Sequence, residues 1–205
     1  MWAGGRVHTS GALRCGEPAT RRTSVLSVQE KSGRSGLLTL IAVQHQTWQR
    51  GRVIIDEQQD IVYRQPVPRG EPSALPADAS PLVPPADGER AIEVSPTLLF
   101  RFSALTYNAH RIHYDRDYAR DVEGYPGLLM HGPLQALAMA EAARAAGYSG
   151  GPHDNGGLSF SYRLTAPLFD HQGMVVSTAR EPDVTVTAVR DSCGRQTAAG
   201  TLRAD

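Results

Sequence analysis

The sequence has few of the residues that mark secreted or membrane proteins. Cysteine occurs only at Cys15 and Cys193. Two cysteines so far apart form no disulfide framework and lack metal-ligand spacing. The N-terminal residues lack the apolar core of a signal peptide, and no apolar stretch reaches the length of a membrane-spanning helix. We therefore expect a soluble protein of the reducing cytoplasm, with no membrane partner.

No charge of one sign dominates either. Lysine plus arginine equals aspartate plus glutamate, 21 of each, and Lys31 is the only lysine. This balance gives no electrostatic reason to expect nucleic acid or a membrane surface as a partner. A hydrophobic fraction of 40% and a charged fraction of 20% are ordinary for a soluble globular protein. The 205 residues suffice for one large domain or two small ones.

A change of composition divides the chain in two. Residues 65–89 are rich in Pro, Ala and Asp and show no periodicity. Proline removes backbone donors and biases the preceding residue towards extended conformations, so this stretch is predicted to be an exposed linker. A second break, residues 147–157, is typical of a loop. We expect separate structural units at residues 1–64 and 90–205.

The segment before the linker shows strand patterns only, in ATRRTSVLSVQEK, GLLTLIAVQHQTW and RVIIDEQQDIVYR. None of it has apolar residues at helical spacing with capping residues. Strands without a helix would leave one face of their sheet bare. We therefore expect residues 1–64 to pair edge-to-edge with the sheet of residues 90–205, or to be covered by a second chain.

The segment after the linker mixes strand and helix patterns. TLLFRFSALT alternates Leu98, Phe100 and Phe102, which predicts a half-buried strand. HYDRDYARDVEG predicts a short helix with Asp115 as its N-cap.

A longer helix is predicted at residues 133–146. Pro133 suits its first position, Gly147 suits the residue just beyond its end, and the interior is mostly alanine. Strands follow in LSFSYRLTAPLF, GMVVSTARE, DVTVTAVRD and QTAAGTLRA, with turn residues between them. This order predicts an α+β fold in which an antiparallel sheet wraps around one helix.

The candidate chemistry lies around three histidines. His110 and His113 follow the predicted strand beside Asn108, and His131 precedes Gly132 at the start of the helix. A helix N-terminus offers unpaired N–H groups and partial positive charge. A histidine base beside such donors could abstract a proton next to a carbonyl. From the residues alone, hydrogen-bonded histidines without chemistry are the simpler interpretation. A metal site is weaker still, because no third ligand stands at helical spacing.

Three phrases carry a resemblance: FSALTYNAHRIHYD, YPGLLMHGPL and FSYRLTAPLF. Residues 95–170 thereby resemble the MaoC-like dehydratases and R-specific enoyl-CoA hydratases. They are most similar to the subgroup with 3-hydroxyacyl-thioester dehydratase type 2 and the mesaconyl-CoA and itaconyl-CoA hydratases. EKSGRSGLLTLIAVQHQTW and DEQQDIVYR resemble the end of the first repeat in double-repeat members. The resemblance implies a hot-dog fold, complete in residues 90–205 and partial in residues 1–64.

The resemblance also implies residue roles. The broader hydratase signature has Asp, then Asn two residues later and His five residues later, where this chain has Asn108, His110 and His113. An amide cannot take a proton at neutral pH, so the usual two-base mechanism is in question. We assign proton transfer to His113, and to Asn108 the orientation of water or the β-hydroxyl. Gly132, with His131 beside it, would bind and polarise the thioester carbonyl.

Further candidates for substrate binding are Tyr107, His110 and Arg163, although an arginine on a strand is more often a solvent-facing charge. The implied reaction is loss of water from a 3-hydroxyacyl thioester, or its addition to an enoyl thioester. No prosthetic group is implied, because CoA or acyl-carrier pantetheine is part of the substrate.

Two other functions stay open. A thioesterase on this fold normally has a carboxylate near the helix, and Glu141, about two turns in, is the sole candidate. A repurposed cyclase, isomerase or binding subunit is also compatible with an incomplete first repeat. Since hot-dog domains pair and the first repeat lacks a helix, we expect a homodimer or higher homo-oligomer. A misassigned start codon would also account for the missing helix.

Overall fold

The computed structural model describes residues 1–33, 36–64, 81–148 and 157–204. Its helices are α1 (Pro96–Leu105), α2 (Arg116–Asp121) and α3 (Gly132–Ala145), with the short 3-10 turns η1 (Arg111–His113) and η2 (Asp170–Gln172). Its strands are β1 (Trp2–Thr9), β2 (Thr20–Gly33), β3 (Gly36–Gln49), β4 (Arg52–Arg64), β5 (Arg90–Ile92), β6 (Leu158–Leu164), β7 (Met174–Arg180), β8 (Thr185–Arg190) and β9 (Gln196–Ala204).

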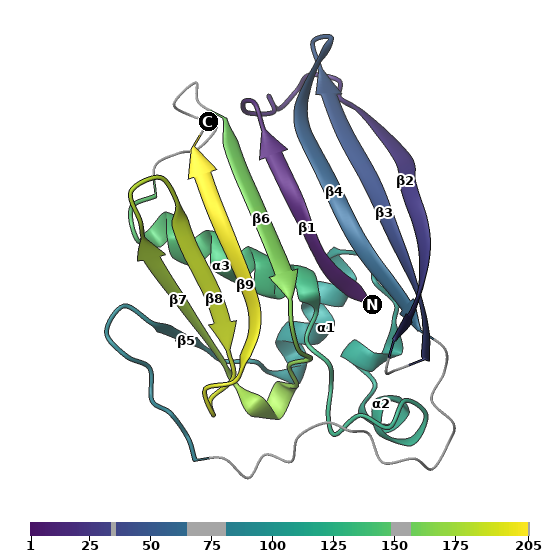
Figure 1. Ribbon diagram of the computed structural model, residues 1–205, viewed down its shortest axis with the longest axis vertical. Coiled ribbons are helices and arrows are strands. Elements are labelled where there is room, and N and C mark those ends of the chain that lie inside the picture. The colour runs from purple at the N-terminus through teal and green to yellow at the C-terminus, as the bar shows by residue number, and fades with distance from the viewer. Residues whose placement is uncertain (34–35, 65–80, 149–156, 205) are drawn as a thin grey trace.

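The described strands form one antiparallel sheet in the order β2-β3-β4-β1-β6-β9-β8-β7-β5. The two segments of the chain meet where β1 pairs with β6, from Gly4 opposite Arg163 to Thr9 opposite Leu158. Figure 1 shows the sheet running without interruption from the N-terminal strands to the C-terminal ones. The expected edge-to-edge pairing of residues 1–64 with residues 90–205 is therefore present.

Helix α3 is the central helix around which the sheet curves (Figure 1). It contacts β1 and β6 through β9, and its buried face is made of Leu134, Gln135, Ala136, Met139 and Ala143. The small side chains on this face allow the helix to lie close to the sheet, as its alanine-rich sequence predicts. The buried Gln135 is satisfied, because its Oε1 accepts a hydrogen bond from Thr197 Oγ1 at 2.8 Å.

The predicted strand in TLLFRFSALT is wrong, because this segment is helix α1. Ser95 caps the helix by accepting a hydrogen bond from Leu98 N, and Pro96 occupies its first turn. Leu99 is fully buried and Ser103 is buried one turn later, whereas Phe100 is 59% exposed. The buried side therefore repeats every four residues, and the alternation of aromatic and aliphatic residues along this segment is incidental.

Strand β1 has no counterpart among the predicted strands, although it lies at the centre of the sheet. Its two adjacent glycines conceal it, since glycine is unfavourable in a strand interior. A Cβ on Gly4 would lie 2.6 Å from the Tyr162 carbonyl oxygen, and one on Gly5 would lie 2.6 Å from the Gln58 carbonyl oxygen. Glycine is therefore needed here because the neighbouring strands approach closely. The other expected strands are present, as is helix α2 with its N-cap Asp115.

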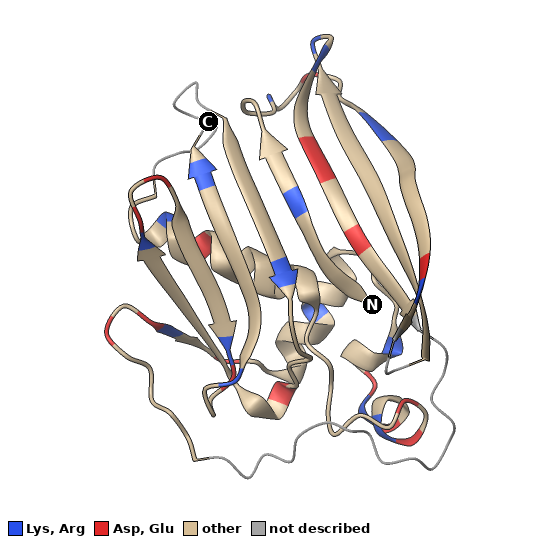
Figure 2. Cartoon of the chain, in the orientation of Figure 1, with Lys and Arg blue, Asp and Glu red and all other residues tan. Residues whose placement is uncertain are grey.

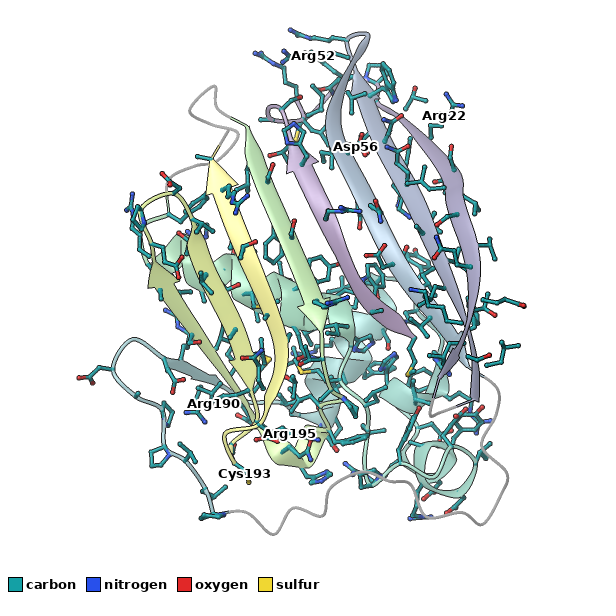
Figure 3. The ribbon with its side chains drawn as sticks, in the orientation of Figure 1. Arg22, Arg52, Asp56, Arg190, Cys193 and Arg195 are labelled. Carbon is teal, nitrogen blue, oxygen red and sulfur yellow. The ribbon has the colours of Figure 1, made fainter. Side chains whose placement is uncertain are left out.

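Most of the predicted linker, residues 65–80, lies outside the described residues. Residues 81–88 are exposed and form neither helix nor strand. Arg190 holds this stretch by bonding the carbonyl oxygens of Val83 and Pro84 and the carboxylate of Glu89. Figure 3 shows Arg190 with Arg195 and Cys193 at one end of β8 and β9. In the described part of the chain, no helix is long and apolar enough to cross a membrane.

Candidate active site

His113 is buried in η1, the turn that follows α1. Its Nδ1 lies 2.7 Å from the carbonyl oxygen of Leu129. Because a carbonyl oxygen can only accept, Nδ1 carries the proton, and in the neutral ring Nε2 keeps its lone pair. The fold therefore fixes which nitrogen of His113 can accept a proton from another molecule.

The environment keeps this ring uncharged at neutral pH. Burial lowers the pKa of His113 from its ordinary 6.5 to about 4. The hydrogen bond to the Leu129 carbonyl opposes this shift, and the nearby His110 adds a smaller lowering. A buried imidazole is harder to charge because the interior solvates an ion poorly. His113 is thus present as a free base throughout the neutral pH range.

His131 lies directly against His113. The two rings are stacked, with centroids 3.7 Å apart and planes 18° apart. His131 Nε2 is 2.9 Å from the Ser103 hydroxyl, and its Nδ1 is buried without a hydrogen-bond partner among the described residues. Burial and then the neighbouring His113 lower the pKa of His131 to about 3. This residue is therefore also neutral, and its side chain is shielded from solvent.

Gly132 begins α3 immediately after His131. A Cβ at this position would overlap Leu164 Cδ1 and would lie 3.4 Å from Trp2 Cβ. Trp2 is itself held to β6, because its Nε1 donates a hydrogen bond to the Tyr162 hydroxyl at 2.9 Å. A side chain at this position would therefore have to displace the end of Leu164, and residues of both sheet halves enclose the start of the helix.

The loop that carries the Leu129 carbonyl is fixed by a buried carboxylate. Asp170 Oδ1 accepts a hydrogen bond from Leu128 N at 3.0 Å, and its other oxygen pairs with Arg116. Leu129 N in turn donates to the Ile112 carbonyl at 2.9 Å. These bonds hold η1, the loop and η2 together. They thereby fix the position of the Leu129 carbonyl oxygen, which orients His113.

The structure brings His113, His131 and Gly132 together, but it places the other candidate residues less centrally. Asn108 Oδ1 accepts from His110 N at 3.1 Å, so this amide caps a tight turn. The exposed His110 ring has its centroid 5.9 Å from that of His113. Tyr107 is 96% exposed. Arg163 lies on β6 with the exposed residues of that strand, on the face opposite Tyr162.

A groove of about 670 Å³ lies on that outer face and includes Arg163, Arg6 and Asp60 in its lining. It contains no histidine, so it is separate from the His113 site. Among the described residues, no group of three His, Cys, Asp or Glu side chains could hold a metal ion. Charged residues of both signs occur along the described strands, helices and turns (Figure 2).

The sequence did not indicate three residues that shape the site. Ser103 contacts His131 across 28 positions of sequence, and Asp170 reaches Leu128 across 42. The Leu129 carbonyl is a backbone group, so the type of residue at this position does not reveal its role.

The chain matches the sequence profile of hydroxyacyl-thioester dehydratase type 2 over residues 1–170. It belongs to that family. A curated relative, the mesaconyl-C(4)-CoA hydratase of Chloroflexus aurantiacus, is 46% identical over 172 residues, which cover 83% of this chain and 58% of the relative. The chain therefore spans little more than half the length of this relative.

Solved structures show that the fold is the hot-dog fold. HtdX from Mycobacterium tuberculosis superposes with a TM-score of 0.73 at 17% identity, covering 99% of this chain and 76% of that one. A second protein of Mycobacterium tuberculosis, described as having a double hot-dog fold, gives a TM-score of 0.58 at 18% identity, with 100% of this chain and 74% of that one covered. The sheet wrapped around α3 is thus the predicted hot-dog architecture.

Proposed function

We propose that this protein is a hydro-lyase of acyl thioesters, which removes water from a 3-hydroxyacyl thioester or adds it to an enoyl thioester. The observation that carries the proposal is the neutral His113, whose proton-accepting Nε2 is fixed by the Leu129 carbonyl beside the start of α3. Membership of the dehydratase family and the name of the Chloroflexus relative support the same reaction class.

In the direction of dehydration, His113 Nε2 would take the proton from the α-carbon. The electron pair of that C–H bond forms the new double bond as the β-carbon–oxygen bond breaks. The protonated ring then returns the proton to the departing hydroxyl, which leaves as water. At pH 7 the ring is in its proton-accepting form, and general acid–base groups contribute roughly 10²–10⁴-fold to the rate.

Two neighbouring groups would support the transfer. The Gly132 N–H, at the positive end of α3, would stabilise the negative charge that develops on the thioester oxygen. Asn108 would hold the β-hydroxyl or the attacking water through its Nδ2, because its Oδ1 is engaged by His110 N. The substrate would need no prosthetic group, since CoA or carrier-bound phosphopantetheine is part of it.

We also propose that a second copy of the chain covers the N-terminal strands. Val25 and Val28 on the edge strand β2 are 64% and 60% exposed, and α3 contacts β1 and β6–β9 instead. Burial of such apolar surface is favourable at about 25 cal/mol per Å². A reducing compartment such as the cytoplasm is proposed because the sequence has only two cysteines, Cys15 and Cys193, which lie far apart along the chain.

Thioester hydrolysis is less well supported. Glu141, the carboxylate that such a reaction would use, is exposed on α3 and paired with Arg144. It lies more than two turns beyond Gly132, so it does not face the start of the helix.

The proposal is tested by incubating the purified protein with crotonyl-CoA and with 3-hydroxybutyryl-CoA while enoyl absorbance and free thiol are recorded together. Enoyl absorbance should change without thiol release. His113→Ala should lower the rate by roughly 10²–10⁴-fold. The control is His8→Ala, which alters an exposed histidine on β1 and should leave the rate unchanged. Full activity of His113→Ala, or thiol release alone, would refute the proposed function.

A further inference from the structure

The stack of His131 on His113 includes a buried nitrogen that the proposed mechanism does not use. His131 is 1% exposed, with Phe102 edge-on at 4.9 Å on one side and His113 at 3.7 Å on another. Its Nδ1 meets no hydrogen-bond partner among the described residues. A side chain so enclosed cannot reach a substrate without rearrangement, so its contact with His113 is the interaction that needs an explanation.

The hydrogen bond to Ser103 decides the tautomer of His131. A buried N–H without an acceptor is costly, whereas a bare lone pair is tolerated more often. The arrangement that avoids a stranded N–H places the proton on Nε2, which donates to the Ser103 hydroxyl at 2.9 Å. Nδ1 then holds only a lone pair. The Ser103 hydroxyl thereby fixes both the orientation and the tautomer of the His131 ring.

The geometry points to His131 as a positioning residue for His113. Anchored by Ser103, its ring would form a wall that fixes the plane of the His113 imidazole and excludes water from that face. This inference rests on the proposed function only in taking His113 as the base. It replaces the expected role of His131 in thioester binding with a role exerted through His113.

The surroundings of His113 make this role measurable. The titratable group that adds to the lowering of its pKa is His110, from the start of its own turn, while His113 itself lowers the pKa of His131 at the start of α3. Burial is the largest cause of the lowered pKa of His113, and the stacked ring supplies part of that burial. Removing the ring should admit water and let the pKa rise from about 4 towards its ordinary 6.5.

The experiment follows the His113 ring by NMR on histidine-labelled protein, its signal being assigned from its loss in His113→Gln. In the wild type the signal should not titrate above pH 5. In His131→Ala the midpoint should rise by about one pH unit or more. His131→Phe preserves a stacked ring, so its midpoint should stay low.

Ser103 provides a second, independent arm. Ser103→Ala strands the Nε2–H of His131, so the ring should loosen and the His113 midpoint should rise by a smaller amount. Adding His131→Phe should cancel that rise, because a phenyl ring needs no anchor, and such non-additivity marks coupled residues. Ser159→Ala is the matched control. It removes a serine that contacts His8 on the strands β1 and β6, at 3.2 Å, and it should leave the His113 midpoint unchanged.

The outcomes separate the two proposals. An unmoved midpoint in His131→Ala, or an increase in Ser103→Ala that persists with His131→Phe, would overturn the positioning role. Activity measured in parallel addresses the base itself. If the midpoint rises but the acid limb of kcat/KM does not follow it, His113 is not the base although His131 still positions it. If both move together while KM is unchanged, both proposals stand.

Discussion

Replacing Gly5 by alanine tests whether the N-terminal strands are an integral part of this sheet. In an ordinary strand, alanine for glycine stabilises by roughly 0.5–1 kcal/mol, because it restricts the unfolded chain. Here the added Cβ would meet the Gln58 carbonyl oxygen at 2.6 Å and the Tyr162 hydroxyl at 2.9 Å. The first of these atoms belongs to the backbone of β4 and cannot turn aside.

Overpacking of this kind costs about 1–3 kcal/mol, which exceeds the gain from chain restriction. We therefore expect a net loss on the order of 1–2 kcal/mol and a fall in Tm of about 2–8 °C for a chain of this size. Urea unfolding and calorimetry would measure both. Gly11→Ala is the matched control, because its Cβ would meet only Arg52 at 3.6 Å, an ordinary contact. If Gly5→Ala were as stable as the wild type, the close approach of β1 to β4 would be refuted.

Three further predictions concern the site and the assembly. The free energy of unfolding should decrease as the pH falls from 6.5 towards 4, because His113 binds a proton in the unfolded chain but resists it in the folded protein. Urea melts of the double variant His113→Gln/His131→Phe should show a weaker dependence of this free energy on pH. Asn108→Asp should retain part of the activity and shift the pH profile of kcat/KM, since a carboxylate there would raise the pKa of a nearby histidine; an unchanged profile would place Asn108 outside the site. Light scattering at micromolar concentration should give the mass of two chains or more, and Val28→Lys should reduce it; a stable wild-type monomer would contradict the proposed assembly.

The sequence predicted elements whose local pattern and tertiary role agree. Helix α3 followed from its start at Pro133 and its end before Gly147, and the strands β6 to β9 followed from alternation between turns. The prediction of secondary structure failed where only long-range contacts determine whether a segment is a helix or a strand. In α1, the alternation of Leu98 and Phe100 predicted a strand, whereas the structure shows a helix that is capped by Ser95 and has a helical buried face. In β1, two glycines concealed a strand that exists because both neighbours approach it closely.

The candidate site, too, could be predicted from the sequence only in part. The resemblance to the family motif identified His113 and Gly132. The structure brings η1, which contains His113, beside the start of α3 at Gly132. Nothing in the pattern indicated that Ser103 would lie against His131, since that contact depends on α1 being a helix that brings Ser103 to its buried face. The error in α1 and the omission of Ser103 from the site therefore have one cause.

The short N-terminal segment takes part in the same arrangement. Strand β1 pairs with β6, and its first residue, Trp2, is bonded to Tyr162 and lies beside Gly132. The start of α3 is thus held between a residue of the first segment and Leu164 of the second, while η1 approaches it from α1. His131 is the residue immediately before the start of α3, so the position of its ring depends on both segments of the sheet. The strands of residues 1–64 therefore stabilise the surroundings of His113 as well as extending the sheet, although none of the proposed catalytic groups lies within them.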